Sequence, residues 1–230
     1  MVALMGEMIE FPSNGGTCPG YLATPASGSG PGIIVIQEWW GLVPHIKDVA
    51  NRFAKEGFVA LAPDLYRGKA ASEPDEAGKF MMALSMAQAA KDLSGAVDEV
   101  ASRGSTSNVG VVGFCMGGGL TLVLACQRPD KVKAACPFYG VIPWPEAQPD
   151  WTKLDAAVEG HYAENDAFAS PEQVAELEVK LRNLGKNVVM YVYPGADHAF
   201  FNDSRPEVYD ASASQLAFAR SVAHLRNHLH

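Results

Sequence analysis

The sequence predicts an α/β fold in which helices cover both faces of a mostly parallel sheet. Two observations predict it. Short apolar runs, of which the β-branched segment 33–36 is the clearest, are typical of strands buried on both faces. These runs alternate along the chain with segments of helical periodicity, which is the pattern of parallel strands joined by right-handed crossovers.

The first half of the chain predicts a hairpin followed by alternating strands and helices. The expected strands lie at 8–11, 20–23, 33–36 and 58–61. The turn signal at 14–16, Asn-Gly-Gly, joins the first two strands. Apolar residues from 46 to 54 recur at helical spacing and end at Gly57, which predicts a helix. Helical sequence then fills 73–103, with a break near Ser85.

The second half continues the alternation. Its expected strands lie at 109–114, 132–138, 156–161 and 188–192. Segment 116–126 is apolar nearly all round and predicts a central helix. Residues 170–173 combine an N-cap serine, a proline and a capping box, so a helix begins there and ends at Gly185. A long amphipathic helix is expected over 206–229.

Composition indicates one compact domain over residues 1–230. Of these residues 48% are hydrophobic and 19% charged, which excludes a disordered chain. The net charge is −8 without a basic block, so neither nucleic acid nor membrane is an expected partner. The first eleven residues lack the apolar core of a signal peptide, and we expect a cytoplasmic protein that acts as a monomer.

Four side chains with catalytic potential each come shortly after a predicted strand: Glu38, Cys115, Asp166 and His198. The carboxyl ends of parallel strands share one edge of the sheet, and ligands bind beyond that edge. We therefore expect these four side chains on one rim.

The segment Gly113-Phe114-Cys115-Met116-Gly117 has the spacing of a nucleophile elbow, G-x-S-x-G, with sulfur in place of oxygen. Glycines are needed there because the sharp turn brings the backbone close to its neighbours. The following helix directs its positive end toward the thiol. The other interpretation of the same residues is a buried cysteine with glycines kept for packing.

The order Cys115, Asp166, His198 matches the order nucleophile, acid, histidine of α/β-hydrolases. His198 would take the thiol proton, and Asp166 would orient the imidazole. Asp197 and Glu164 compete for the role of the acid. Asp166 is preferred to Asp197 because a residue adjacent to the histidine would have to fold back on itself.

Neither a cofactor nor a metal is expected. The glycines at 117–119 lack the spacing of a dinucleotide fingerprint, and no lysine of a phosphate loop follows them. None of the four cysteines forms a C-x-x-C pair.

The chain resembles the dienelactone hydrolase (carboxymethylenebutenolidase) family. The matching segments are Gln37-Glu38-Trp39-Trp40-Gly41, Ala62-Pro63-Asp64-Leu65-Tyr66, Gly113-Phe114-Cys115-Met116-Gly117-Gly118, Gly160-His161-Tyr162-Ala163-Glu164-Asn165-Asp166 and Tyr193-Pro194-Gly195-Ala196-Asp197-His198-Ala199-Phe200. They span nearly the whole chain. The resemblance implies an α/β-hydrolase fold without a large cap, no metal, and a cysteine–histidine–aspartate triad.

The resemblance also implies roles that spacing does not show. Glu38 would hold the thiol at rest, then swing when substrate binds and help to generate the thiolate. The backbone N–H groups of Met116 and Trp39 would form the oxyanion hole. Trp40, Tyr139 and Phe200 are expected in an apolar wall that contacts substrate, with ordinary core packing as the alternative for each.

The chain departs from the family in its arginines. Two arginines are expected to bind a substrate carboxylate, one in the helical region after 64–66 and one shortly after the histidine. Here no arginine lies between Arg67 and Arg103, and the first after His198 is Arg205. Lys79, Arg67 or Arg205 could substitute, so the substrate stays open.

A sulfur nucleophile restricts the substrate. Thiolate leaves a tetrahedral intermediate more readily than a simple alkoxide or an amine. We therefore expect hydrolysis of activated esters and enol lactones through a thioester, with little activity on amides and alkyl esters. The alternatives are a carboxylesterase or lactonase of broader specificity on the same triad, a thiol redox sensor at Cys115, and a non-enzymatic binding module.

Overall fold

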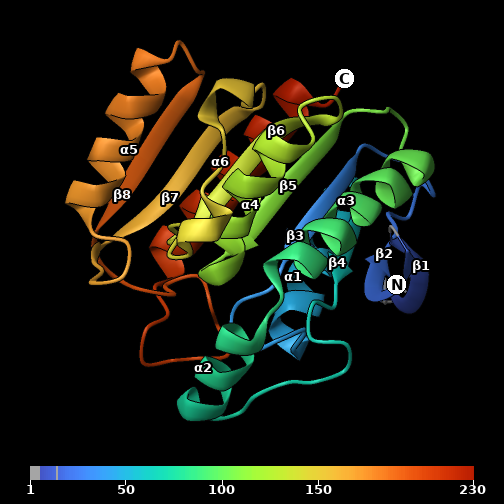
Figure 1. Ribbon diagram of the computed structural model, residues 1–230, viewed down its shortest axis with the longest axis horizontal. Coiled ribbons are helices and arrows are strands. Elements are labelled where there is room, and N and C mark those ends of the chain that lie inside the picture. The colour runs from blue at the N-terminus through green and yellow to red at the C-terminus, as the bar shows by residue number, and fades with distance from the viewer. Residues whose placement is uncertain (1–5, 14) are drawn as a thin grey trace.

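The computed structural model describes residues 6–13 and 15–230, and eight strands form one sheet (Figure 1). The strands are β1 (Glu7–Ser13), β2 (Gly16–Ala23), β3 (Gly32–Ile36), β4 (Val59–Pro63), β5 (Val109–Phe114), β6 (Val132–Phe138), β7 (Ala157–Asn165) and β8 (Val188–Asp197). Their order is β1-β2-β4-β3-β5-β6-β7-β8. Strands β1 and β2 pair antiparallel, as do β2 and β4, and every other pair is parallel. The predicted fold class is confirmed.

Helices cover both faces of the sheet (Figure 1). They are α1 (Pro44–Lys55), α2 (Pro74–Ala83), α3 (Met86–Arg103), α4 (Met116–Gln127), α5 (Pro171–Asn183) and α6 (Ala211–His228), with short 3₁₀ helices η1 (Pro145–Ala147) and η2 (Trp151–Lys153). Helices α1 and α6 pack on the face that carries Ile33 and Val35. Helices α3, α4 and α5 pack on the face that carries Ile34 and Ile36. Strand β3 is therefore buried on both sides, as its sequence predicts.

Local signals account for the helix boundaries. The predicted break near Ser85 is confirmed, because the Ser85 hydroxyl caps α3 by accepting the N–H of Gln88. The predicted capping box at 170–173 is also present. The final helix begins at Ala211 and not at 206, because Asp210 is its N-cap and accepts the N–H of Ala213. Asn14 of the predicted hairpin turn lies outside the described residues.

The topology places the chemistry at one edge. The carboxyl ends of β3, β5, β7 and β8 all point to the same rim, which carries the loops that contain Glu38, Cys115, Asp166 and His198. Among the helices of residues 6–13 and 15–230, none has both the length and the hydropathy to cross a membrane.

Candidate active site

Cys115 occupies a sharp turn between β5 and α4. Its backbone has φ 53° and ψ −116°, a conformation that costs a non-glycine residue about 1–3 kcal/mol. The Cys115 N–H donates to the Phe138 carbonyl (3.0 Å), and the Cys115 carbonyl accepts from the Gly118 N–H (2.9 Å). Cys115 is half-buried, whereas Cys18, Cys126 and Cys136 are buried. The strained turn therefore presents this thiol to the rim.

The flanking glycines are required by close backbone contacts. A Cβ on Gly113 would lie 2.1 Å from the Gly117 carbonyl oxygen, and one on Gly117 would lie 2.5 Å from the Gln37 carbonyl oxygen. Real Cβ atoms do not approach backbone atoms so closely. The two glycines of the predicted elbow are therefore required for the steric reason that the sequence analysis gave.

His198 directly follows β8 and is paired with Asp166, which directly follows β7. The distance from His198 Nδ1 to Asp166 Oδ2 is 2.7 Å. The other oxygen of Asp166 accepts the N–H groups of Phe168 (2.8 Å) and Ala169 (3.0 Å). Burial alone would raise the pKa of Asp166, but its bonds to His198 and to these two amides lower it. Asp166 is thus an ionised, fixed acceptor that sets the orientation of the imidazole.

The pKa of His198 is raised to about 10. Burial acts to lower it, but the hydrogen bond to Asp166 and the proximity of the Cys115 side chain outweigh burial. The imidazole therefore favours its charged form at neutral pH, with the Asp166 carboxylate as its hydrogen-bonded partner.

The rival acids are placed elsewhere. Asp197 is exposed to solvent, and Glu164 accepts the N–H of Gly195 (2.8 Å). Within the part of the chain that the structure describes, Asp166 is the carboxylate bonded to His198.

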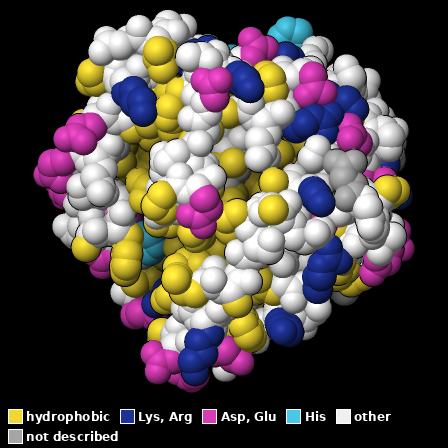
Figure 2. Space-filling model, in the orientation of Figure 1, with side chains coloured by type: hydrophobic (Ala, Val, Ile, Leu, Met, Phe, Trp, Pro, Cys, Tyr) yellow, Lys and Arg dark blue, Asp and Glu magenta, His cyan; other side chains and the backbone are white. Residues whose placement is uncertain are grey.

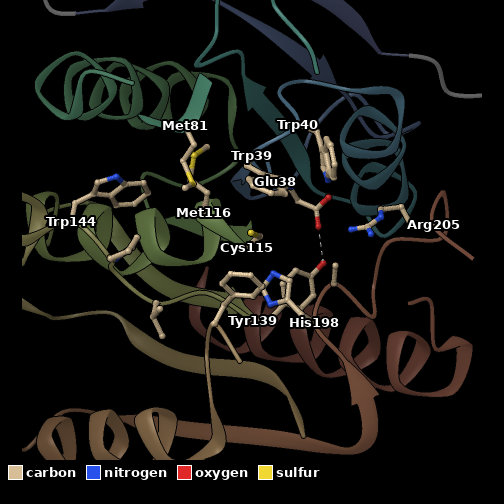
Figure 3. Close-up of a pocket in the computed structure, with 14 residues that line it drawn as sticks. Glu38, Trp39, Trp40, Met81, Cys115, Met116, Tyr139, Trp144, His198 and Arg205 are labelled. Atoms are coloured by element: carbon tan, nitrogen blue, oxygen red, sulfur yellow. Dashed lines mark hydrogen bonds between the residues drawn. The ribbon is translucent and has the colours of Figure 1, made fainter. Parts of the chain in front are cut away.

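The Glu38 carboxylate is hydrogen-bonded to Tyr139 (Figure 3) and also to Asn202. The Tyr139 hydroxyl donates to Oε1 (3.2 Å), and Asn202 Nδ2 donates to Oε2 (2.7 Å). Among the described residues no hydrogen bond joins Glu38 to Cys115. The expected resting contact is therefore absent, because two other donors already bind both carboxylate oxygens.

A cavity of about 200 Å³ opens beside Cys115, and Glu38 and His198 line it as well. The remaining residues of its wall are Trp39, Trp40, Met81, Met116, Tyr139, Val141, Pro143, Trp144, Phe168, Ala199 and Arg205. Met81 and Trp144 lie on one side of Cys115, and Trp40 and Arg205 lie on the other (Figure 3). Hydrophobic side chains also gather across the middle of the molecular face seen in Figure 2.

One expected wall residue is wrong. Phe200 is fully buried and packs behind Tyr139, with 5.5 Å between the two ring centroids. The chain turns back at Ala199, whose φ is 67°, and carries Phe200 into the core. Trp40 and Tyr139 line the cavity as expected.

The sequence-based interpretation missed part of the wall. Met81 comes from α2, Trp144 from the loop before η1, and Phe168 from the loop after β7. No motif marks these residues, and only Trp144 and Phe168 lie in loops that could have pointed to them. Of the candidate cations, Arg205 lines the cavity over the Trp40 ring (5.5 Å), whereas Arg67 pairs with Asp92 (2.8 Å).

The two residues expected to supply the oxyanion hole line the same cavity. Met116 begins α4 and Trp39 follows Glu38, and both line the wall beside the thiol. Within the described chain, neither N–H donates to a backbone carbonyl or a side chain. No group of three or more histidine, cysteine and acidic side chains in that part of the chain is arranged to hold a metal.

Comparison with known proteins gives a consistent picture. Residues 18–229 match the model of the dienelactone hydrolase family. The protein usf of Aquifex pyrophilus is 41% identical, with 98% of this chain and 100% of that protein covered. An Aquifex aeolicus protein provisionally named carboxymethylenebutenolidase is 35% identical with the same coverage. A crystal structure from Klebsiella pneumoniae, provisionally named dienelactone hydrolase, has a TM-score of 0.87 and 30% identity and covers 97% of this chain and 98% of its own.

Proposed function

Because the chain belongs to the dienelactone hydrolase family and is a hydrolase that acts on esters, we propose that it opens activated esters and enol lactones through a thioester on Cys115. One observation carries the proposal. Cys115 lies on a strained turn in a cavity that His198 also lines, and the His198 imidazole is 2.7 Å from a buried carboxylate. This arrangement supports a nucleophile, a base and the group that orients the base.

The first step forms the bond between sulfur and the acyl carbon. His198 Nε2 takes the proton of the thiol, and the thiolate attacks the carbonyl carbon. The carbonyl oxygen becomes an oxyanion, which the N–H groups of Met116 and Trp39 stabilise. Each such donor contributes about 3–4 kcal/mol to the transition state.

The second step breaks the bond to the departing oxygen. The tetrahedral intermediate collapses, the enolate or phenolate leaves, and His198 supplies the proton. His198 then takes a proton from water, the resulting hydroxide attacks the thioester, and the carboxylic acid leaves as Cys115 recovers its proton. Asp166 keeps the imidazole in the required tautomer throughout.

Sulfur sets the substrate class. Thiolate is a better leaving group than an alkoxide or an amine, so attack on an alkyl ester or an amide mostly reverses. A stabilised enolate or phenolate competes with the thiolate and lets the reaction proceed. We therefore infer that the protein favours enol lactones and aryl esters.

The cavity favours a broader esterase over strict dienelactone specificity. Among the described residues Arg205 is the one arginine or lysine that lines it. Nine apolar side chains line it as well: Trp39, Trp40, Met81, Met116, Val141, Pro143, Trp144, Phe168 and Ala199. This wall suits an aryl or branched alkyl substituent, and it offers no second arginine to a carboxylate.

A panel of lactones and esters, assayed with the wild type and with Cys115→Ala, tests the proposal. We expect turnover of p-nitrophenyl acetate and enol lactones, loss of that turnover in Cys115→Ala, and the same loss after thiol alkylation. Consumption of peroxide without esterase activity would indicate the redox sensor, and neither activity would indicate a binding module. Efficient cleavage of peptides would contradict the leaving-group argument.

A further inference from the structure

The cavity beside Cys115 offers few hydrogen bonds to a water molecule. Nine of the side chains in its wall are apolar. Glu38 is 1% exposed, and its two oxygens accept hydrogen bonds from Tyr139 (3.2 Å) and Asn202 (2.7 Å). Arg205 is paired with Glu207 (2.9 Å). Because an ordered water molecule needs about two to four polar partners, the cavity holds water poorly, and an acceptor with an apolar part can compete with it.

The ring of Phe168 lies next to the imidazole in the same cavity. The ring centroids of Phe168 and His198 are 5.3 Å apart. Phe168 is 73% exposed, so its ring presents open apolar surface. Its backbone is held in place, because the Phe168 N–H donates to Asp166 Oδ1 (2.8 Å). A primary alcohol whose hydroxyl reaches the imidazole can therefore lay its alkyl chain against Phe168.

The chemistry of sulfur lets an alcohol take the acyl group and keep it. When an alcohol attacks a thioester, the thiolate leaves the tetrahedral intermediate more readily than the alkoxide, so the reaction proceeds. Its product is an alkyl ester. By the same argument the alkyl ester is a poor substrate for Cys115, since renewed attack by sulfur mostly reverses. The alkyl ester therefore accumulates while the activated ester is consumed.

We propose that the protein is also an acyltransferase, which passes the acyl group of an activated ester to a short primary alcohol in competition with water. The proposal rests on the proposed function, since it needs the thioester on Cys115. His198 takes the proton of the alcohol hydroxyl, and the oxygen forms a bond to the acyl carbon. The bond between that carbon and sulfur breaks, and the thiolate recovers the proton from His198.

A series of alcohols tests the proposal with the wild-type protein. The protein is mixed with p-nitrophenyl acetate and an equal concentration of methanol, ethanol, 1-propanol or 1-butanol. Release of p-nitrophenol reports acylation, and gas chromatography gives the ratio of alkyl acetate to acetic acid. A buried CH₂ group favours binding about fourfold. We therefore expect the ratio to rise about tenfold or more from methanol to 1-butanol, which adds three such groups.

Two exposed side chains provide a variant and its matched control. Phe168→Ala removes the ring beside the imidazole and keeps the backbone N–H that donates to Asp166. We expect it to lower the preference for 1-butanol over methanol on the order of fivefold, because the alkyl chain loses apolar contact. Met82 is 78% exposed and lies outside the wall of the cavity, so Met82→Ala should leave the preference unchanged.

Three results would overturn the proposal: acetic acid as the single product, a product ratio that differs less than about twofold between methanol and 1-butanol, or equal preferences in Phe168→Ala and wild type. The first two need no variant, so they decide the question even if Phe168→Ala does not fold. Release of p-nitrophenol that persists in Cys115→Ala would refute the proposed function. Release that depends on Cys115 but yields acid alone would refute this inference alone.

Discussion

Replacement of Asp166 by asparagine isolates the role of the acid without disturbing its loop. The Asp166 side chain is fully buried. An asparagine can keep its oxygen on the N–H groups of Phe168 and Ala169, which now lie 2.8 and 3.0 Å from Oδ1. Its NH₂ group then faces His198 Nδ1, where the carboxylate was. The ring must accept at Nδ1, so Nε2 carries the proton and cannot take another from the thiol.

The expected loss of rate in Asp166→Asn follows from the pKa of His198. The rise from 6.5 to about 10 corresponds to about 5 kcal/mol at about 1.36 kcal/mol per pKa unit. The bond to Asp166 and the proximity of the Cys115 side chain produce this rise jointly, against burial. If Asp166 supplies about half, its loss costs about 2–3 kcal/mol, or about a hundredfold in rate. The pKa of His198 falls as well, so the alkaline limit of activity moves to lower pH.

The assay is the pH dependence of kcat/KM for p-nitrophenyl acetate. We expect Asp166→Asn to lose about a hundredfold at pH 7, and the wild type to stay active until the pH nears the His198 pKa of about 10. Asp197→Asn is the matched control, because Asp197 is exposed and adjacent to the histidine in sequence. The reasoning is refuted if Asp166→Asn keeps more than a third of the wild-type rate, or if Asp197→Asn loses as much.

Three further predictions follow from the same geometry. Cys115→Ser should lose most activity on enol lactones, since a hydroxyl needs stronger base assistance; a rate within threefold of wild type would contradict this. Trp144→Ala should raise the KM for 2-naphthyl esters about tenfold and change the KM for p-nitrophenyl acetate little, because the larger naphthyl group buries more apolar area against the cavity wall. Equal changes in the two KM values would contradict the assignment of Trp144 to the substrate-binding wall. The stabilisation from protonated His198 should be complete below pH 6.5 and be lost as the pH rises through about 10, because its pKa is raised in the folded state. Chemical unfolding of wild type and His198→Gln should therefore give free energies that converge over that interval.

The sharp turn at Cys115 and the gathering of Cys115, Asp166 and His198 at one rim were predictable because local rules and topology fix them. Backbone contacts at Gly113 and Gly117 demand glycine, so the motif can be recognised from spacing alone. Parallel strands bring the residues that follow them to one rim, so the order Cys115, Asp166, His198 could be interpreted without knowing any distance.

The rest of the site depends on side-chain directions that spacing does not encode. Phe200 lies two residues after His198, yet the turn at Ala199 carries it into the core. Glu38 faces Tyr139 and Asn202 because of hydrogen bonds across 101 and 164 residues of sequence. Trp144 reaches the cavity from a loop with no motif. Such long-range contacts appear only once the chain is folded.

In the proposed mechanism the thiolate at position 115 carries the acyl group. Rapid quenching of the protein mixed with a p-nitrophenyl ester, followed by peptide mass spectrometry, tests it most directly. We expect the mass of one acyl group to appear on the peptide that contains Cys115, at a rate consistent with turnover, and to be absent in Cys115→Ala. An acyl adduct on a different residue, or ester turnover undiminished in Cys115→Ala, would contradict it.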